Sequence, residues 1–256
     1  MITTSAHLAE LRKRLIVSFG AIFLFAGLSY IFAEQIARFF MAPLFHASPT
    51  LLKLIYTNLT EAFITYLKLS LLMGVIFSIP VLIYQLWMFI APGLLANERK
   101  IVFTVVFWAT LLFIAGAAFS FFIVLPRILH FFMGFAGPQL TPLPKLSGYL
   151  TFVARTTLAF GLSFEIPFLM VAAARIGWVK RDHFSSKRKF FYPVILVLSL
   201  LLAAGDIMAS VMLCLPLIGL YEAGIITIRL FTGKPEKSEE ISPAKTDGTG
   251  PDQDNG

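Results

Sequence analysis

The chain has 256 residues, of which 58% are hydrophobic and only 14% are charged, and its mean hydropathy is +0.83. Soluble domains typically contain about 45–50% apolar and about 25% charged residues. The composition therefore excludes a disordered chain, a disulfide scaffold and a soluble enzyme of alternating strands and helices. It predicts an all-α, polytopic integral membrane protein with a single bilayer-embedded domain over residues 1–231.

The net charge is the second informative feature. Lys and Arg number 21 against 14 Asp and Glu, which gives a net charge of +7. In a soluble protein this excess would suggest a nucleic-acid partner, whereas a polytopic membrane protein carries such charge in its cytoplasmic loops. We therefore expect no nucleic acid as a partner. Cys214 is the single cysteine, so an internal disulfide and a cysteine metal cluster are excluded, and its apolar surroundings favour a packing role.

Six apolar runs are predicted to cross the membrane, because a helix needs about 20 apolar residues to span about 30 Å of hydrocarbon. The first run follows a basic cluster but is too long and lacks a cleavage site, so we interpret it as an uncleaved span. The last two come from one long run that we divide at Gly205-Asp206, and the short fifth span implies local bilayer thinning or tilt of its neighbours. The expected spans are residues 15–33, 69–91 (with a kink at Pro80), 101–125, 149–174, 190–204 and 207–228.

The positions of Lys and Arg predict the orientation, because positively charged loops stay in the cytoplasm. If the N-terminus is inside, most of the 21 basic residues fall on the cytoplasmic side. The opposite side then holds only Arg38, Lys53, Arg127 and Lys145. Both termini are therefore expected in the cytoplasm.

The segments outside the spans differ in composition. The two longer outer loops, residues 34–68 and 126–148, contain Pro, Gly and small polar residues, which predict short structured caps on the bundle. Residues 232–256 are polar and rich in Gly, Pro, Asp and Glu, which predicts a disordered cytoplasmic tail.

Signatures of soluble active sites are absent from the sequence. There is no Gly-rich phosphate loop and no metalloprotease pattern, and the four histidines are scattered over loops and span ends. We therefore expect no enzyme activity, no catalytic residues, no metal site and no cofactor.

Glu165 is the most unusual single residue, since it lies near mid-depth in the fourth expected span. A carboxylate there costs about 2.5–3.5 kcal/mol on insertion scales. One interpretation of Glu165 is a polar site that faces the bundle interior or a partner. The other is a protonated side chain that is hydrogen-bonded to a neighbouring helix. Arg155 lies about 15 Å away along the helix and about 80° around it, so we expect it to reach toward the interface instead. Pro167 interrupts the helix nearby and favours a concavity around Glu165.

Three further acidic residues stand out. Glu10 and Glu98 lie on the mostly cationic cytoplasmic side, where a carboxylate can receive a basic ligand. The spacing equally allows an ordinary i, i+4 pair between Glu10 and Arg14, and Glu98 is equally explained as a solvated loop charge. Asp206 is most simply a polar turn residue at the outer surface.

Three motifs resemble the TatC family, the multispanning receptor subunit of the twin-arginine protein translocase. The first is residues 7–15 (HLAELRKRL), which are similar to the amino-terminal motif of the family. The second is residues 84–94 (YQLWMFIAPGL) with 97–100 (NERK), which are similar to its first cytoplasmic loop. The third is residues 159–167 (AFGLSFEIP), which resemble its fourth-span motif. The likeness extends over residues 6–230, and the turn before Asp206 (AAGD) departs from the family pattern.

The resemblance implies a six-span, glove-shaped protein that binds twin-arginine signal peptides of folded cargo at the cytoplasmic face of the bacterial inner membrane. Glu10 and Glu98 would accept charge-assisted hydrogen bonds from the two guanidinium groups, for which lysine is a poorer substitute. Glu165 would contact the transmembrane helix of a partner or the inserted apolar part of the signal. The residues that would shape or brace the peptide site are Leu11, Arg12, Arg14, Phe89, Pro92 and Arg99.

The same resemblance implies single-span partner subunits of the TatA and TatB type, self-association within the bilayer and transport driven by the proton-motive force. Asp206 would be the aspartate of the outer hairpin. A secondary transporter of a small solute is the alternative, since it would also carry intramembrane charges, although the sequence shows no internal repeat. A purely structural scaffold is a third interpretation, which ligand binding would distinguish.

Overall fold

The computed structural model describes residues 4–47, 54–90, 99–134, 143–175, 183–203 and 206–231. These residues are almost entirely helical, with one isolated β-bridge between Ile55 and Lys145. The all-helical class predicted from the composition is therefore confirmed. The helices are α1 (Thr4–Ile31), α2 (Ala33–Ala47), α3 (Glu61–Ile90), α4 (Arg99–Phe119), the π-helical turn η2 (Ser120–Val124), α5 (Leu125–Gly134), α6 (Leu146–Arg175), α7 (His183–Ser186), α8 (Arg188–Leu202) and α9 (Ile207–Phe231).

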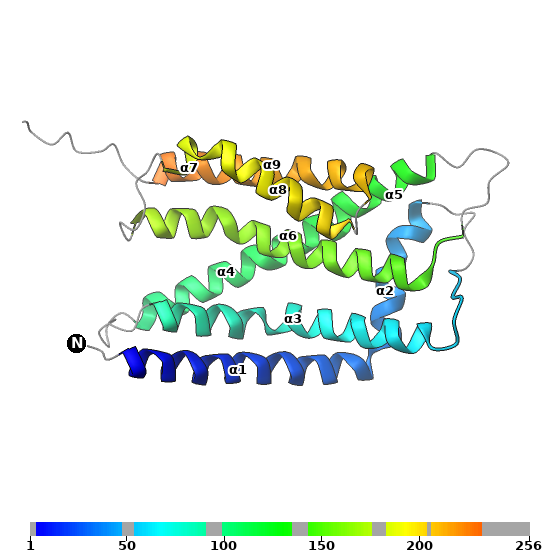
Figure 1. The fold of residues 1–256 in the computed structure, drawn as a ribbon, viewed down its shortest axis with the longest axis horizontal. Coiled ribbons are helices and arrows are strands. Elements are labelled where there is room, and N and C mark those ends of the chain that lie inside the picture. The colour runs from blue at the N-terminus through cyan, green and yellow to red at the C-terminus, as the bar shows by residue number, and fades with distance from the viewer. Residues whose placement is uncertain are drawn as a thin grey trace, which may run out of the picture.

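The long helices lie side by side along the longest axis of the molecule (Figure 1). Helices α1, α4 and α8 run in one direction, and α3, α6 and α9 return. The end at which α1 begins and α3 and α6 finish is called the N-terminal end below. The opposite end, at which α8 finishes and α9 begins, is called the far end. Helix α1 packs along α3 at one edge of the bundle, and α8 and α9 form the other edge.

Among the described residues, five helical segments are long and apolar enough to cross a membrane. They are Leu8–Ile31, Glu61–Phe89, Phe103–Gly134, Leu146–Ala174 and Ile207–Leu230. The remaining expected span coincides with α8, which has 15 residues and therefore rises only about 22 Å against about 30 Å of hydrocarbon. Helices α8 and α9 flank the position at which the long apolar run was divided.

The helices extend beyond the apolar runs. Helix α3 begins at Glu61, well before residue 69, and continues through Pro80. Part of the first outer loop is the amphipathic helix α2, so Pro43, expected in a loop, lies inside a helix. Its apolar face buries Ala37, Phe40 and Leu44 at helical spacing, and this burial stabilises the helix against the bundle. The hydropathy runs missed these parts because they detect only long uncharged segments.

A π-helical turn joins α4 to α5. The backbone N–H of Leu125 donates to the carbonyl of Ser120, one residue further back than in an α-helix. Pro126 follows immediately and has no N–H to donate. The wider turn therefore accommodates the proline, and the helix continues to Gly134.

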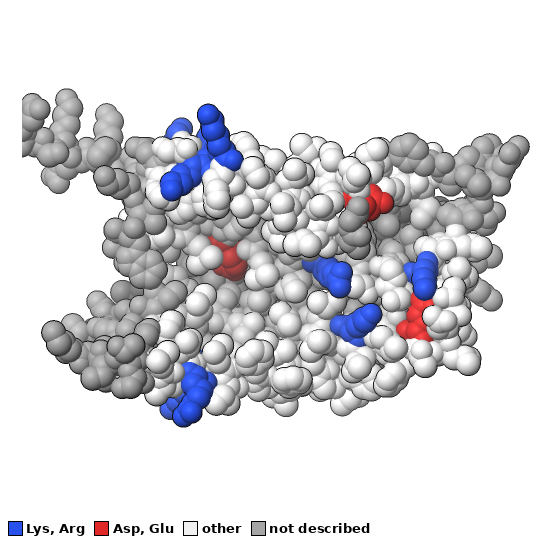
Figure 2. Space-filling view, in the orientation of Figure 1, with Lys and Arg blue, Asp and Glu red and all other residues white. Residues whose placement is uncertain are grey.

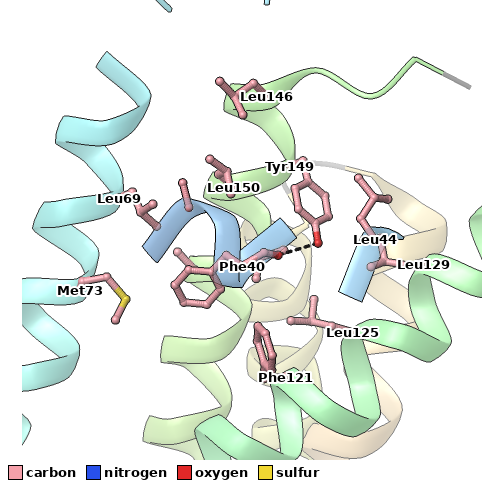
Figure 3. Close-up of a cluster of buried hydrophobic side chains, with 13 residues drawn as sticks. Phe40, Leu44, Leu69, Met73, Phe121, Leu125, Leu129, Leu146, Tyr149 and Leu150 are labelled. Carbon is pink, nitrogen blue, oxygen red and sulfur yellow. Dashed lines mark hydrogen bonds between the residues drawn. The ribbon is translucent and has the colours of Figure 1, made fainter. Parts of the chain in front are cut away.

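One cluster of buried apolar side chains fixes the far end (Figure 3). It joins Phe40 of α2, Leu69 of α3, Phe121 of η2 and Leu150 of α6. Within it, the Tyr149 hydroxyl donates to the Phe40 carbonyl oxygen at 2.9 Å, so α2 is held to α6 by a buried hydrogen bond.

A second cluster joins α6 to α8 and α9. Phe160 and Met170 of α6 pack with Ile195 of α8 and with Leu213 and Tyr221 of α9. Because α6 contributes to both clusters, it is the central helix of the bundle. The expected packing role of Cys214 agrees with its position, since it is a buried free thiol in this second cluster.

Three glycines allow two helix pairs, α1 with α3 and α4 with α6, to approach closely. A Cβ at Gly74 of α3 would lie 2.7 Å from the Cβ of Ala26 in α1. A Cβ at Gly116 of α4 would lie 2.6 Å from the Phe160 carbonyl oxygen, and one at Gly161 would lie 2.5 Å from the Phe113 ring. Small residues at such positions let helix backbones pack by van der Waals contact, the main attraction between helices in lipid.

Candidate functional site

Glu10 and Arg14 form an ion pair near the start of α1. The Glu10 Oε1 atom accepts from Arg14 Nη2 at 2.5 Å and from Nε at 3.2 Å. The i, i+4 pairing considered from the sequence is therefore present. The second oxygen, Oε2, makes no hydrogen bond to any residue that the structure describes. One oxygen of Glu10 thus has acceptor capacity to spare.

Arg14 also connects α1 to α3. Its Nη1 donates to Gln85 Oε1 at 3.3 Å. A recess of about 410 Å³ surrounds this contact, and Glu10 and Lys13 line it together with Arg14 and Gln85. The ion pair therefore forms part of the wall of a recess at the N-terminal end.

An apolar groove adjoins this recess. It has a volume of about 380 Å³ and lies between α1 and α3. Arg14 and Gln85 line both cavities, so the groove leads directly from the charged recess along the two helices. Its walls are Leu11, Leu15, Ser18, Phe19 and Ile22 from α1, and Leu82, Leu86 and Phe89 from α3.

The structure brings some of the predicted peptide-site residues together. Leu11 of α1 and Phe89 of α3 both line the groove, and Arg14 lines both cavities. Arg12 is exposed on α1 and is not among the lining residues of either cavity. Pro92, Glu98 and the side chain of Arg99 lie outside the described residues, although α4 begins at Arg99.

Glu165 is buried on α6, with 7% of its surface exposed. Its Oε1 has no hydrogen-bond partner within the described part of the chain. Pro167 lies two residues further along the same helix. An unpaired polar atom in an apolar bundle costs free energy, which a partner group from outside the described chain would recover. The described residues therefore provide no hydrogen-bond partner for Oε1, and the interpretation as a polar contact site stays a prediction.

Asp206 caps the start of α9. Its Oδ1 accepts from the backbone N–H of Ala209 at 2.9 Å, and its carbonyl oxygen accepts from the Ser210 hydroxyl at 2.5 Å. A side chain that accepts from the third residue into a helix satisfies one of the free N–H groups of the first turn. Asp206 therefore caps α9, whereas from the sequence it was expected only to be a polar turn residue.

Sequence analysis missed a second acidic site, at the far end. Glu61 is 7% exposed, and its Oε2 accepts from the backbone N–H of Thr57 at 2.9 Å and from the Thr57 hydroxyl at 3.2 Å. Its Oε1 accepts from the Ser147 N–H at 3.4 Å, and Lys145 Nζ lies 3.7 Å from Oε2. Thr57 lies only four residues before Glu61, whereas Lys145 and Ser147 are more than 80 positions away and no sequence pattern connects them to Glu61.

The sequence also did not predict that Glu222 of α9 connects two helices. It accepts from Arg188 Nη2 at 2.7 Å and from the Tyr192 hydroxyl at 2.5 Å. Both donors are on α8, so the carboxylate ties the two helices together near the N-terminal end. Nothing in the local sequence pairs residues separated by 30 or more positions.

Lys and Arg gather mainly toward the two ends of the bundle, and some basic side chains also lie over the middle of the face in Figure 2. Among the described residues, no group of three or more His, Cys, Asp or Glu side chains could hold a metal ion. The fold and these sites define the class: a multi-helix membrane protein that offers a charged recess and an apolar groove at one end.

Similarity to known proteins identifies the family within this class. A family model described as Sec-independent protein translocase protein (TatC) matches residues 6–216. TatC proteins of Desulforapulum autotrophicum and Escherichia coli strain K12 are 38% and 34% identical, over 94% and 91% of this chain and 89% and 91% of their own lengths. A crystal structure of a twin arginine translocase receptor, TatC, is similar with a TM-score of 0.81 and 34% identity, over 88% of this chain and 98% of that one.

This chain belongs to the TatC family, as its motifs predicted. It is a multi-pass bacterial membrane protein, and its function is protein transport by the twin-arginine system.

Proposed function

We propose that this chain is the receptor subunit that binds twin-arginine signal peptides, with the peptide lying along α1 and α3. The observation that carries the proposal is the continuity of two cavities: a recess with an acceptor oxygen on Glu10, and an apolar groove that shares Arg14 and Gln85 with it. A signal peptide has the same order of properties, since an apolar segment follows its basic residues. The recess would take a guanidinium group and the groove would take apolar residues.

Glu98 is the proposed second acceptor. It immediately precedes Arg99, where α4 begins, and α4 begins at the same end of the bundle as α1. Two carboxylates from different segments would each accept from one guanidinium group, which presents several donors in a plane. In this proposal Leu11 and Phe89 form walls of the site, and Arg12, Arg14, Pro92 and Arg99 brace it.

The proposed topology has six crossings with both termini in the cytoplasm. The distribution of Lys and Arg supports this orientation, and it places Glu10 on the cytoplasmic side, where signal peptides are first met. Helix α8 would be the short crossing, with a thinner bilayer beside it. Asp206 then caps the outer hairpin, and the polar tail after α9 is cytoplasmic.

Glu165 is proposed to contact a transmembrane helix of a TatA- or TatB-type subunit, or the inserted apolar part of the signal. Its unpaired Oε1 supports a role in contact with a group from another molecule. Assembly with these subunits and with further copies of this chain would form the transport complex, and the proton-motive force would drive it.

The test is direct peptide binding to the purified full-length protein in detergent. A twin-arginine signal peptide and its twin-lysine version are titrated against the unmodified protein and the variants Glu10→Gln and Glu98→Gln. We expect arginine-selective binding that weakens about tenfold or more in each variant, because a charge-assisted hydrogen bond is lost. Glu34→Gln is the matched control, since Glu34 forms the same i, i+4 pair with Arg38 on α2 at the far end.

Three results would contradict the proposal. Equal binding of the two peptides would exclude arginine recognition. Selective binding that both glutamate variants retain would exclude the carboxylate assignment. Absence of any peptide binding to the folded protein would favour a transporter of small solutes instead.

A further inference from the structure

Arg155 is a charged side chain inside a predicted membrane span. It lies on α6, within the apolar segment Leu146–Ala174, and its side chain is exposed. No hydrogen bond or ion pair joins it to any residue that the structure describes. Such a guanidinium group is costly in hydrocarbon, so an anion beside it would stabilise the inserted protein.

An apolar groove begins at Arg155. The groove has a volume of about 390 Å³ and lies between α6 and α8. On the α6 side, it follows one helical stripe from Arg155 through Leu158, Ala159, Leu162 and Ser163 to Ile166. On the α8 side, the walls are Leu198 and Leu202. The groove therefore has one charged end and an apolar body.

The short helix α8 sets the depth of Arg155. Leu202, the last residue of α8, lines the same groove as Arg155, and because α8 runs antiparallel to α6 it lies nearer the Arg155 end of the groove than Leu198 does. Side chains also lean toward the start of their own helix, and α6 starts at the far end. Arg155 thus reaches toward the membrane surface at the far end, which the short α8 draws inward.

We propose that Arg155 binds the phosphate of an anionic phospholipid in the leaflet at the far end, with an acyl chain of that lipid in the groove between α6 and α8. The stripe from Arg155 to Ile166 rises about 16 Å, which is close to half of the about 30 Å hydrocarbon thickness. A groove of that length matches the acyl chain of one leaflet. The guanidinium group offers several planar donors, which suit phosphate oxygens.

The dimensions favour a lipid over the transmembrane helix of a partner protein. Such a helix crosses the whole bilayer and is about 10–12 Å wide with its side chains. The stripe of the groove on α6 rises only about 16 Å, and its single cation, Arg155, lies at the end nearer the start of α6. A lipid has the same polarity, with one anionic head and an apolar chain directed toward the membrane centre.

The test measures lipid binding to the full-length protein by native mass spectrometry in detergent, with phosphatidylglycerol as the probe. Arg155→Gln is expected to weaken the tightest lipid site about tenfold or more, because it removes a charge-assisted contact. Leu162→Trp, which fills the groove, should have a similar effect, and Arg155→Lys should retain most of the binding. Lys68→Gln is the matched control: Lys68 is also an exposed cation in an apolar span, but it does not line this groove.

Unchanged lipid binding in Arg155→Gln would overturn the proposal, and so would an equal loss in Lys68→Gln, which would indicate general charge attraction. Retained lipid binding combined with lost binding of a single-span peptide that carries a glutamate would assign the groove to a partner helix. The melting temperature in a thermal unfolding assay serves as the folding control in every variant. This inference is independent of the proposed peptide site and can fail without affecting it.

Discussion

The two ends of the bundle use carboxylates in opposite ways. At the far end, Glu61 accepts from Thr57 and Ser147 and lies beside Lys145, so its partners all come from this chain. At the N-terminal end, Glu10 pairs with Arg14 through one oxygen only and lines a recess of about 410 Å³.

The number of donors that reach a carboxylate separates structural from functional carboxylates. A buried carboxylate that receives several donors stabilises the fold and has little capacity left for a ligand. A carboxylate with a free oxygen beside a cavity contributes less to the fold and can accept from a second molecule. Glu165 is an intermediate case, because it is buried like Glu61 and yet has an unpaired oxygen.

The largest expected effect on stability is that of Glu61→Ala. The change leaves the Thr57 and Ser147 donors without their acceptor, while the backbone bridge between Ile55 and Lys145 still joins the two outer loops. We expect a melting temperature lower by several degrees in a thermal unfolding assay, with unchanged peptide affinity in the protein that remains folded. Lys145→Ala is the milder control, because the lysine is half-exposed and 3.7 Å away. A peptide affinity that falls with Glu61→Ala would show that the two ends are coupled.

Ser18→Trp is expected to weaken peptide binding about tenfold, since the indole would occupy space in the groove between α1 and α3. A shortened peptide that retains both arginines but lacks the apolar segment should be insensitive to the change. Gly20→Trp is the matched control on the same helix, because the space around Gly20 is open and Gly20 does not line the groove. If both peptides lose affinity equally, the apolar segment does not lie in this groove.

Asp206→Ala should destabilise the protein by about 1 kcal/mol, because α9 loses its N-terminal cap. Asp206→Asn should retain most of the stability, since the amide oxygen can accept the same hydrogen bond. Chemical denaturation monitored by circular dichroism measures both. Equal losses in the two variants would show that the charge, and not the cap, is what matters at this turn.

The smallest expected effect on stability is that of Glu165→Gln. No described hydrogen bond to Oε1 is lost, so the melting temperature should stay the same or rise slightly. The same substitution at Glu61 should be destabilising, because an amide cannot accept at both oxygen positions. A large destabilisation by Glu165→Gln would mean that the contact of this carboxylate with the Phe113 backbone stabilises the fold, as the contacts of Glu61 do.

Much of the fold could be predicted from the sequence. The apolar runs located the long helices. In lipid the backbone of such a run must form its own hydrogen bonds, and a helix does so within one segment. The extensions did not follow from hydropathy. Helix α2 and the start of α3 depend on packing against α6 and on the hydrogen bond from Ser147 to Glu61, which are contacts between distant parts of the chain.

The candidate site was likewise only partly predictable from the sequence. The motifs selected Glu10, Leu11, Arg14 and Phe89, but only the packing of α1 on α3 placed Leu11 and Phe89 across one groove and connected Arg14 to Gln85. From the sequence, Arg155 was expected only to reach toward the membrane interface. The groove that it lines depends on where α8 ends relative to α6, which the sequence does not show.

The sequence by itself determined the helical class, the approximate spans, the bias of positive charge and membership of the TatC family. These properties depend on composition and on residues close together in the chain. Only the tertiary structure decided which carboxylates receive hydrogen bonds from several donors and which keep an oxygen available to a ligand. Their donors, such as Ser147 for Glu61 and Arg188 for Glu222, come from distant helices and loops that meet only when the bundle packs.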